Sequence, residues 1–135
     1  MNTLIGLLFA TSTLNFGLPP YLLNAVCWTE SRYNVHAIHL HDGQGTSVGI
    51  CQIKLKTARW MGFKGSLSEL QKPDVNIHYA AKYLSYNLLR YHGNIKKALV
   101  AYNMGNAKKF NETAYSKKVI KKYNEFKQED FYATQ

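Results

Sequence analysis

Residues 73–105, PDVNIHYAAKYLSYNLLRYHGNIKKALVAYNMG, decide the fold class of this chain. Apolar side chains recur at helical spacing through the first part of the segment, and Gly93 is a typical helix stop. Asn94 then suits the N-cap of a second helix, which has an apolar face of its own and would end at Gly105. The segment therefore predicts two consecutive helices and a mainly α protein.

A further helix is predicted upstream, in residues 17–34, GLPPYLLNAVCWTESRYN. Its proline pair suits a first turn, where a missing N–H costs nothing, and an apolar stripe follows. Glu30 lies one turn after Cys27, on or beside the buried face, where partial desolvation raises the pKa of a carboxyl and favours the neutral acid. An exposed Glu near a helix end, paired with Arg32, is the simpler alternative for a lone Glu.

The helical pattern breaks after Asn34. The Gly-rich, polar stretch that follows contains Asp42-Gly43, a hairpin signal, and predicts a small β excursion from about residue 38 to 53. A short helix before Gly62 and a lysine-rich C-terminal helix complete the pattern. We therefore expect a mainly α member of the α+β class with one small β-hairpin excursion.

The chain is 135 residues long, which fits one domain with a sizeable core. The N-terminal apolar segment has two interpretations, a signal-like sequence with a cleavage site near Ser12 or a first core helix ending at Gly17. It has no Lys or Arg before its apolar run, and it is much shorter than the ~20 residues of a membrane span. We divide the chain into an apolar segment, a main domain and a polar tail: 1–16, 17–126 and 127–135.

The charge balance is strongly basic, with 17 Lys and Arg against 8 Asp and Glu, a formal net charge of +9. This charge predicts attraction to polyanions, among them nucleic acid, anionic lipid and the acidic polymers of a bacterial envelope. Hydrophobic residues make up 46% of the chain and charged residues 19%, a balance typical of a globular protein and not of a disordered one.

Cysteines and histidines give weaker signals. The two cysteines, Cys27 and Cys51, allow either one disulfide or two reduced, buried thiols. His36, His39 and His41 alternate without a thiol partner, which favours a solvated loop over a metal site. We therefore expect neither a metal nor another cofactor.

One polar residue stands out at the end of the β excursion. Gln52 lies between apolar neighbours in the run GICQI, residues 49–53. A buried amide must have its donors and acceptor paired, either by the fold or by a ligand.

Four motifs in order resemble the soluble lytic transglycosylase family, lysozyme-like enzymes that act on peptidoglycan. They are AVCWTESRYNVHAI, SVGICQI, the helical segment NIHYAAKYLSYNLLRYHGNIKKALVAYNMG, and ETAYSKKV. Glu30-Ser31 is similar to the Glu-Ser pair of the family, and Gly49 to Gln52 to its Gly-Leu-Met-Gln motif. Ala101 to Gly105 matches Ala-Tyr-Asn-x-Gly, and the last motif has one residue fewer than the family pattern between Thr113 and Tyr115. The resemblance covers residues 17–123.

The resemblance implies a lysozyme-like fold with Glu30 as catalytic acid. It also implies a set of substrate-binding residues, Ser31, Ser47, Gln52, Tyr102, Asn103 and Tyr115. Core packing is an equal alternative for Tyr102, and a helix-terminal hydrogen bond for Ser31. If the resemblance holds, Cys27 and Cys51 both flank the cleft, where a disulfide would pin the catalytic helix to the β excursion.

Two mechanisms follow from the resemblance. In a lytic transglycosylase, Glu30 acts first as acid and then as base, and the product carries 1,6-anhydroMurNAc. A goose-type lysozyme would instead hydrolyse the bond, with Asp42 as the candidate second acid, although a turn-forming role explains Asp42 equally well. Those enzymes tend to carry Asp where this chain has Lys54, which favours the transglycosylase.

The implied partners are peptidoglycan glycan strands, met by a monomer in the periplasm or the extracellular cell wall. We expect no nucleic-acid partner and no stable membrane span, since the positive charge suits attraction to an anionic wall. A basic module that binds wall polymer or nucleic acid without catalysis remains the alternative. A phage lysis or virion protein and a bacterial secretion-linked wall enzyme fit the sequence equally.

Overall fold

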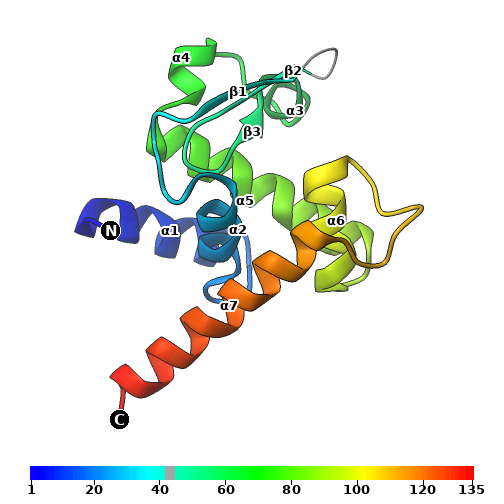
Figure 1. Ribbon diagram of the computed structural model, residues 1–135. Helices are drawn as coiled ribbons and strands as arrows, with labels where there is room; N and C mark the ends of the chain where they lie inside the picture. The colour runs from blue at the N-terminus through cyan, green and yellow to red at the C-terminus, as the bar shows by residue number, and fades with distance from the viewer. Residues whose placement is uncertain (42–44) are drawn as a thin grey trace.

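The computed structural model describes residues 1–41 and 45–135. Helices predominate over a small antiparallel sheet, as the sequence predicts (Figure 1). The elements in chain order are α1 (Thr3–Asn15), α2 (Leu22–Ser31), β1 (Ile38–His41), β2 (Gly45–Val48), β3 (Ile53–Lys54), α3 (Leu55–Trp60), α4 (Leu67–Leu70), α5 (Pro73–Arg90), α6 (Ile95–Met104) and α7 (Ala114–Ala133).

Helix α5 is the central element of the fold, because α1, α2, α3, α4 and α6 all pack against it. Its buried face carries Ile77, Ala81 and Leu84, each 0% exposed. The two helices predicted from residues 73–105 are confirmed. The Asn94 side chain accepts a hydrogen bond from the N–H of Lys97 and thereby caps α6.

Helix α2 starts later than the sequence predicts. The proline pair lies before the helix and not in its first turn, because Tyr21 is the N-cap and has a left-handed backbone with φ of 74°. The helix then buries Leu22, Leu23 and Val26 completely. Its C-terminal end, which carries Glu30, leaves the core and reaches the surface of the protein.

The predicted β excursion is a three-stranded antiparallel sheet in the order β1-β2-β3. Ile38 pairs with Val48, and Val48 pairs with Ile53, so the register brings both ends of the excursion together. Val48 and Ile53 belong to a small second core with side chains of α3 and α4. Asp42 and Gly43, predicted as the turn, lie outside the described residues.

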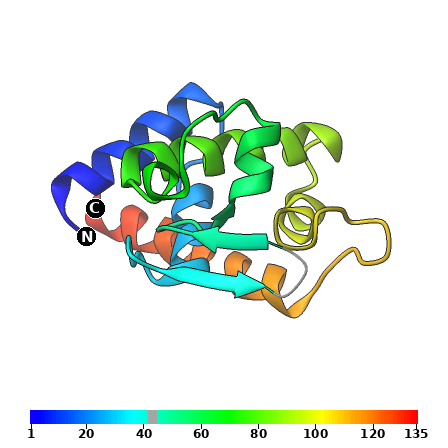
Figure 2. The ribbon, with the colours of Figure 1, turned by 90° about the horizontal axis from the view of Figure 1, so that it is seen from above.

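The N-terminal apolar segment forms helix α1, which lies alongside α5 (Figure 2). Ile5 and Phe9 are buried in the main core, while Leu4, Leu7 and Leu14 are exposed. The segment is thus helical and contributes two side chains to the core, while the choice between a signal-like sequence and a first core helix stays a prediction. Within the described residues, no helix combines the length and the hydrophobicity that crossing a membrane requires.

Helix α7 begins with a capping box in which Thr113 and Ser116 bond each other's backbone N–H groups. It continues through Ala133, so most of the stretch that the sequence suggests as a polar tail extends this helix. No Gly or Pro follows Gly105 in the sequence, which removes the usual helix breakers from this region. The N-terminal part of α7 packs against α2 and α6 and thereby reaches the neighbourhood of Glu30.

Candidate active site

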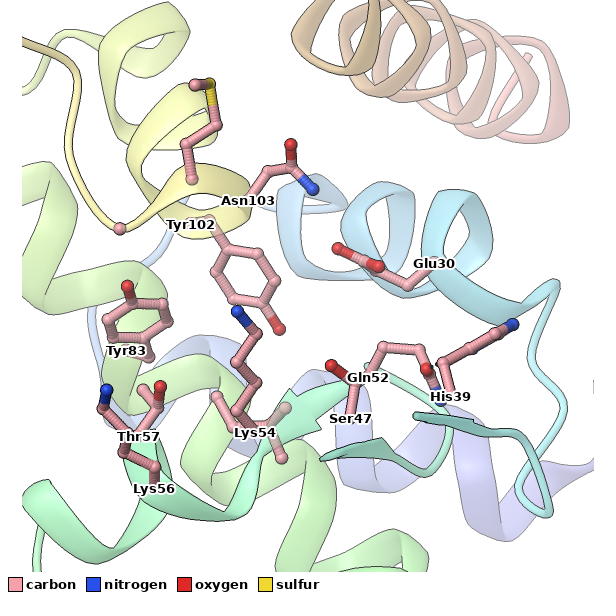
Figure 3. Close-up of a pocket in the computed structure, with 13 residues that line it drawn as sticks. Glu30, His39, Ser47, Gln52, Lys54, Lys56, Thr57, Tyr83, Tyr102 and Asn103 are labelled. Atoms are coloured by element: carbon pink, nitrogen blue, oxygen red, sulfur yellow. Dashed lines mark hydrogen bonds between the residues drawn. The ribbon is translucent and has the colours of Figure 1, made fainter. Parts of the chain in front are cut away.

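A pocket of about 810 Å³ lies between the end of α2, the sheet, and helices α3, α5 and α6 (Figure 3). It brings together segments that are far apart in the sequence. Its lining consists of Glu30, His39, Ser47, Gln52, Ile53, Lys54, Lys56, Thr57, Tyr83, Tyr102, Asn103, Met104 and Gly105. Among these lining residues Glu30 has the one carboxyl group, so acid chemistry in the described part of the pocket depends on it.

Glu30 is half-buried at the end of α2, and its carboxyl points into the pocket. The phenol of Tyr115 donates a hydrogen bond to Glu30 Oε2 at 2.8 Å. Burial raises the pKa of Glu30 from 4.5 to about 7, although the Tyr115 hydrogen bond and the charges of His39 and Lys54 act in the opposite direction. At neutral pH the group therefore exchanges its proton readily, as a residue acting as both acid and base must.

Two connections hold the C-terminal end of α2, which carries Glu30, against the loop that precedes β3. A disulfide joins Cys27 to Cys51. The Ser31 hydroxyl donates to the carbonyl of Ile50 at 2.6 Å and accepts from the N–H of Asn34 at 3.0 Å. Ser31 lies outside the pocket lining, so the structure favours a helix-terminal hydrogen bond over the expected substrate contact.

Gln52 lies in the pocket wall, but its amide is paired by the protein and is only 7% exposed. Its Nε2 donates to the carbonyls of Ala37 and Gly49, at 3.0 and 2.9 Å. Its Oε1 lies 2.6 Å from Nδ1 of His39, which donates to it. Groups of the cleft itself therefore satisfy the buried amide, and Gln52 braces the sheet against the loop.

Asn76 is a positioning residue that the sequence analysis missed. It is 0% exposed in α5, and its Nδ2 donates to the carbonyls of Val48 and Leu70, both at 2.8 Å. Its Oδ1 accepts from the N–H of Cys51 at 2.9 Å. The sequence signal was a polar amide on the apolar face of a helix. This amide fixes the loop that carries Gln52.

Helix α6 supplies the opposite wall. Tyr102 is 7% exposed, lines the pocket, and donates from its phenol to the carbonyl of Cys51 at 2.9 Å. It therefore packs in the core and also lines the pocket, while its contact with substrate stays a prediction. Asn103 is exposed, and its amide projects toward the cavity beside Glu30 (Figure 3). Ser47 lines the pocket from β2 and is 5% exposed.

Several predicted residues lie elsewhere. Tyr115 is outside the lining and acts on the pocket through Glu30. His36 is also outside it, and the side chain of His41 lies outside the described part of the chain. No metal-binding group of three or more His, Cys, Asp or Glu occurs among the described residues. Asp42, the candidate second acid, lies outside the described part of the chain. Sequence reasoning assigned no role in the cleft to Lys56 or Tyr83.

Comparisons with known proteins show which proteins this chain is similar to. The family model described as Transglycosylase SLT domain matches residues 8–125. Protein IpgF of Shigella flexneri is 30% identical over 113 residues, which cover 80% of this chain and 73% of IpgF. The X polypeptide of Escherichia coli is 29% identical over 119 residues, or 84% of this chain and 70% of that protein.

Two solved structures share the fold. Lytic transglycosylase Slt from Pseudomonas aeruginosa, solved as an inactive mutant, is 31% identical with a TM-score of 0.63. The alignment covers 72% of this chain and 16% of that one, so the similarity concerns a small part of a much larger protein. A 70-kDa soluble lytic transglycosylase in complex with bulgecin A has the same TM-score at 21% identity, over 87% of this chain and 18% of that one.

Proposed function

Because this chain belongs to the transglycosylase SLT domain family, we propose that it cleaves the β-1,4 bond between MurNAc and GlcNAc in peptidoglycan and forms 1,6-anhydroMurNAc. The observation that carries the proposal is the carboxyl of Glu30, half-buried in the pocket with a pKa of about 7. A group with this pKa serves as acid and as base near neutral pH. The lysozyme-like, mainly helical fold holds it at the end of a buried helix.

In the first step, neutral Glu30 protonates the glycosidic oxygen, and the bond between that oxygen and the MurNAc anomeric carbon breaks. The GlcNAc side leaves with a free 4-hydroxyl. The N-acetyl group of the substrate stabilises the oxocarbenium-like centre, so the protein supplies no nucleophile. We assign to the amide of Asn103 the role of holding that N-acetyl group, and its exposed position in the pocket near Glu30 supports the assignment.

In the second step, ionised Glu30 accepts the proton of the MurNAc 6-hydroxyl, and the oxygen attacks the anomeric carbon to close the anhydro ring. The phenol of Tyr115 donates to the carboxylate during this step and stabilises its charge. The Coulombic effect of Lys54 on the pKa of Glu30 has the same direction. The proton balance closes, since Glu30 ends protonated and ready for another cycle.

Hydrolysis on the same fold is the competing outcome, and it differs in the product. A hydrolase needs a second group to activate water, and goose-type lysozymes carry acids for this purpose. In the described part of the pocket Glu30 is the one carboxyl, and Lys54 is a lining residue. By resemblance, goose-type lysozymes tend to carry Asp at the position of Lys54. The expected location is the periplasm or the outer cell wall, where the net charge of +9 favours association with anionic polymer.

The test is mass analysis of muropeptides released from purified peptidoglycan. We expect products one water lighter than reducing muropeptides, and a loss of rate of about 100-fold or more with Glu30→Gln. Glu125→Gln is the matched control, because this carboxyl pairs with Lys122 on α7 and lies outside the pocket lining, and the variant should remain active. Reducing ends would make the enzyme a hydrolase, and release that persists in Glu30→Gln would refute the assignment of the acid.

A further inference from the structure

Four aromatic rings form a continuous row from the pocket to the protein surface. Tyr102 and Tyr83 both line the pocket, and their ring centroids are 5.3 Å apart. Tyr83 stacks on Tyr86 with centroids 6.4 Å apart and planes 12° apart. Trp60 meets Tyr86 edge to face at 5.0 Å, and it is 63% exposed. The row therefore begins in the pocket wall and ends in solvent.

The positions of these residues on their helices place the outer rings next to the cleft. Trp60 follows the pocket-lining Lys56 by four residues in the helical run of α3, and Tyr86 follows the pocket-lining Tyr83 by three residues in α5. Residues at these spacings share one face of a helix, about one turn apart. Helices α3 and α5 pack against each other. Trp60 and Tyr86 thus continue the pocket wall by one turn on two neighbouring helices.

A third side chain links this outer surface to the pocket rim. The guanidinium of Arg90 lies 5.9 Å from the centroid of the Tyr86 ring. The same group donates from Nη1 to the carbonyl of Gly105 at 2.9 Å, and Gly105 lines the pocket. Arg90 therefore connects the rings to the end of α6, and donors of its guanidinium lie beside an exposed aromatic surface.

An exposed indole offers a large apolar face together with an N–H donor, a combination that is enriched where proteins meet a partner. Trp60 is 63% exposed, and its ring meets Tyr86 edge to face. A pyranose ring presents an apolar face of C–H groups and an edge of hydroxyls. An aromatic surface beside guanidinium donors matches both parts of this ligand.

We propose that Trp60 and Tyr86 form a further glycan subsite, which holds a sugar ring of the strand beyond the pocket. The inference rests on the proposed function, since a glycan strand is the occupant of the pocket from which the row extends. Its consequence is a dependence on strand length: a strand that reaches Trp60 binds more tightly than one that fills the pocket alone.

Binding to peptide-free chitooligosaccharides of increasing length tests the subsite without cleavage. All variants carry Glu30→Gln, and calorimetry measures affinity. With Trp60 intact, we expect affinity to rise with length and then level off. Trp60→Ala should weaken binding of the longest oligomers about fivefold to tenfold and leave the shortest unchanged, whereas Trp60→Phe should restore most of the loss. Leu89→Ala is the control, because this side chain is 78% exposed and should not affect binding.

Two results would overturn the subsite: equal affinity of Trp60→Ala and its parent for long oligomers, or an equal loss at every length. Intrinsic fluorescence gives a second readout. In a Trp28→Phe background Trp60 is the remaining tryptophan, so its emission should change with long oligomers and not with short ones. The proposed reaction and the proposed subsite can be refuted independently. Absence of anhydro products from the wild-type protein would refute the reaction. A loss of affinity in Trp60→Ala that grows with oligomer length would still support the subsite.

Discussion

The phenol of Tyr115 bonds the carboxyl of Glu30 at 2.8 Å, although 85 positions separate the two residues in the chain. Glu30 lies in the last turn of α2, and Tyr115 lies in the first turn of α7. Burial of the carboxyl and this hydrogen bond have opposite effects on its pKa, and burial dominates. The balance between them determines at which pH the carboxyl carries its proton.

Removal of the Tyr115 hydroxyl should shift the activity profile toward higher pH. The hydrogen bond stabilises the ionised form and lowers the pKa of Glu30, so Tyr115→Phe should raise that pKa further. The basic limb of kcat/KM on purified peptidoglycan should move upward, with a loss of kcat below about tenfold at pH 6. Tyr123→Phe on the same helix is the control. A shift toward lower pH would contradict the assigned role of the hydrogen bond.

Glu30→Gln should stabilise the protein at alkaline pH. The pKa of Glu30 is about 7 in the folded protein and 4.5 ordinarily, so the folded state holds the proton more tightly. Folding free energy is therefore lost as pH rises from 4.5 through 7, by about 3 kcal/mol at most. Urea unfolding should show the variant more stable than wild type at pH 8 and nearly equal at pH 4. A constant difference across this range would exclude titration of Glu30 as the cause.

Reduction of the Cys27–Cys51 bond should destabilise the protein and impair catalysis. The bond closes a loop with a sequence separation of 24, and such a crosslink stabilises by about 3 kcal/mol. The double variant Cys27→Ser, Cys51→Ser should lower the free energy of unfolding by about this amount. It should also reduce kcat more than it raises KM, because the disulfide is one of the two connections that hold the end of α2 near Glu30. Two free thiols in the mass of the purified, unreduced protein would refute the bridge.

Gly49→Ala should be the most damaging glycine substitution near the cleft. Gly49 has φ of +82°, and a Cβ there would overlap the side-chain amide of Asn76. Gly93→Ala is the matched control, because Gly93 has φ of +81° and open space around it. We expect Gly93→Ala to cost about 1–2 kcal/mol from backbone strain, and Gly49→Ala to cost at least about 2 kcal/mol more. If thermal unfolding shows the same loss of stability for both variants, the side chain of Asn76 can move away from the added Cβ without a cost in free energy.

The parts of the fold that follow from local chemistry could be predicted from sequence. The helices within residues 73–105 have an apolar period and an N-cap at Asn94, and both α5 and α6 form as expected. The start of α2 could not be predicted, because Tyr21 adopts a left-handed backbone that sequence seldom reveals in a residue other than glycine. Helix α7 extends further than the sequence suggests. Its C-terminal part is polar and was assigned to a tail, but it contains several residues with high helix propensity.

Some features of the candidate site could also be predicted from the sequence, and others could not. The positions of Glu30 and Asn103 in the pocket follow from motifs that a single sequence displays. The role of Asn76 depends on three backbone groups that only the folded chain brings together. The contact between Trp60 and Tyr86 joins two helices separated by a loop, so no local pattern predicts it.

The disulfide also determines how the protein responds to a cut in its backbone. The bond closes residues 27–51 into a covalent ring that contains Glu30 and both strands of the first hairpin. A protease that cleaves one peptide bond within this ring leaves the two pieces of chain joined through sulfur. The helix that carries Glu30 and the loop that carries Gln52 therefore remain covalently connected after such a cut.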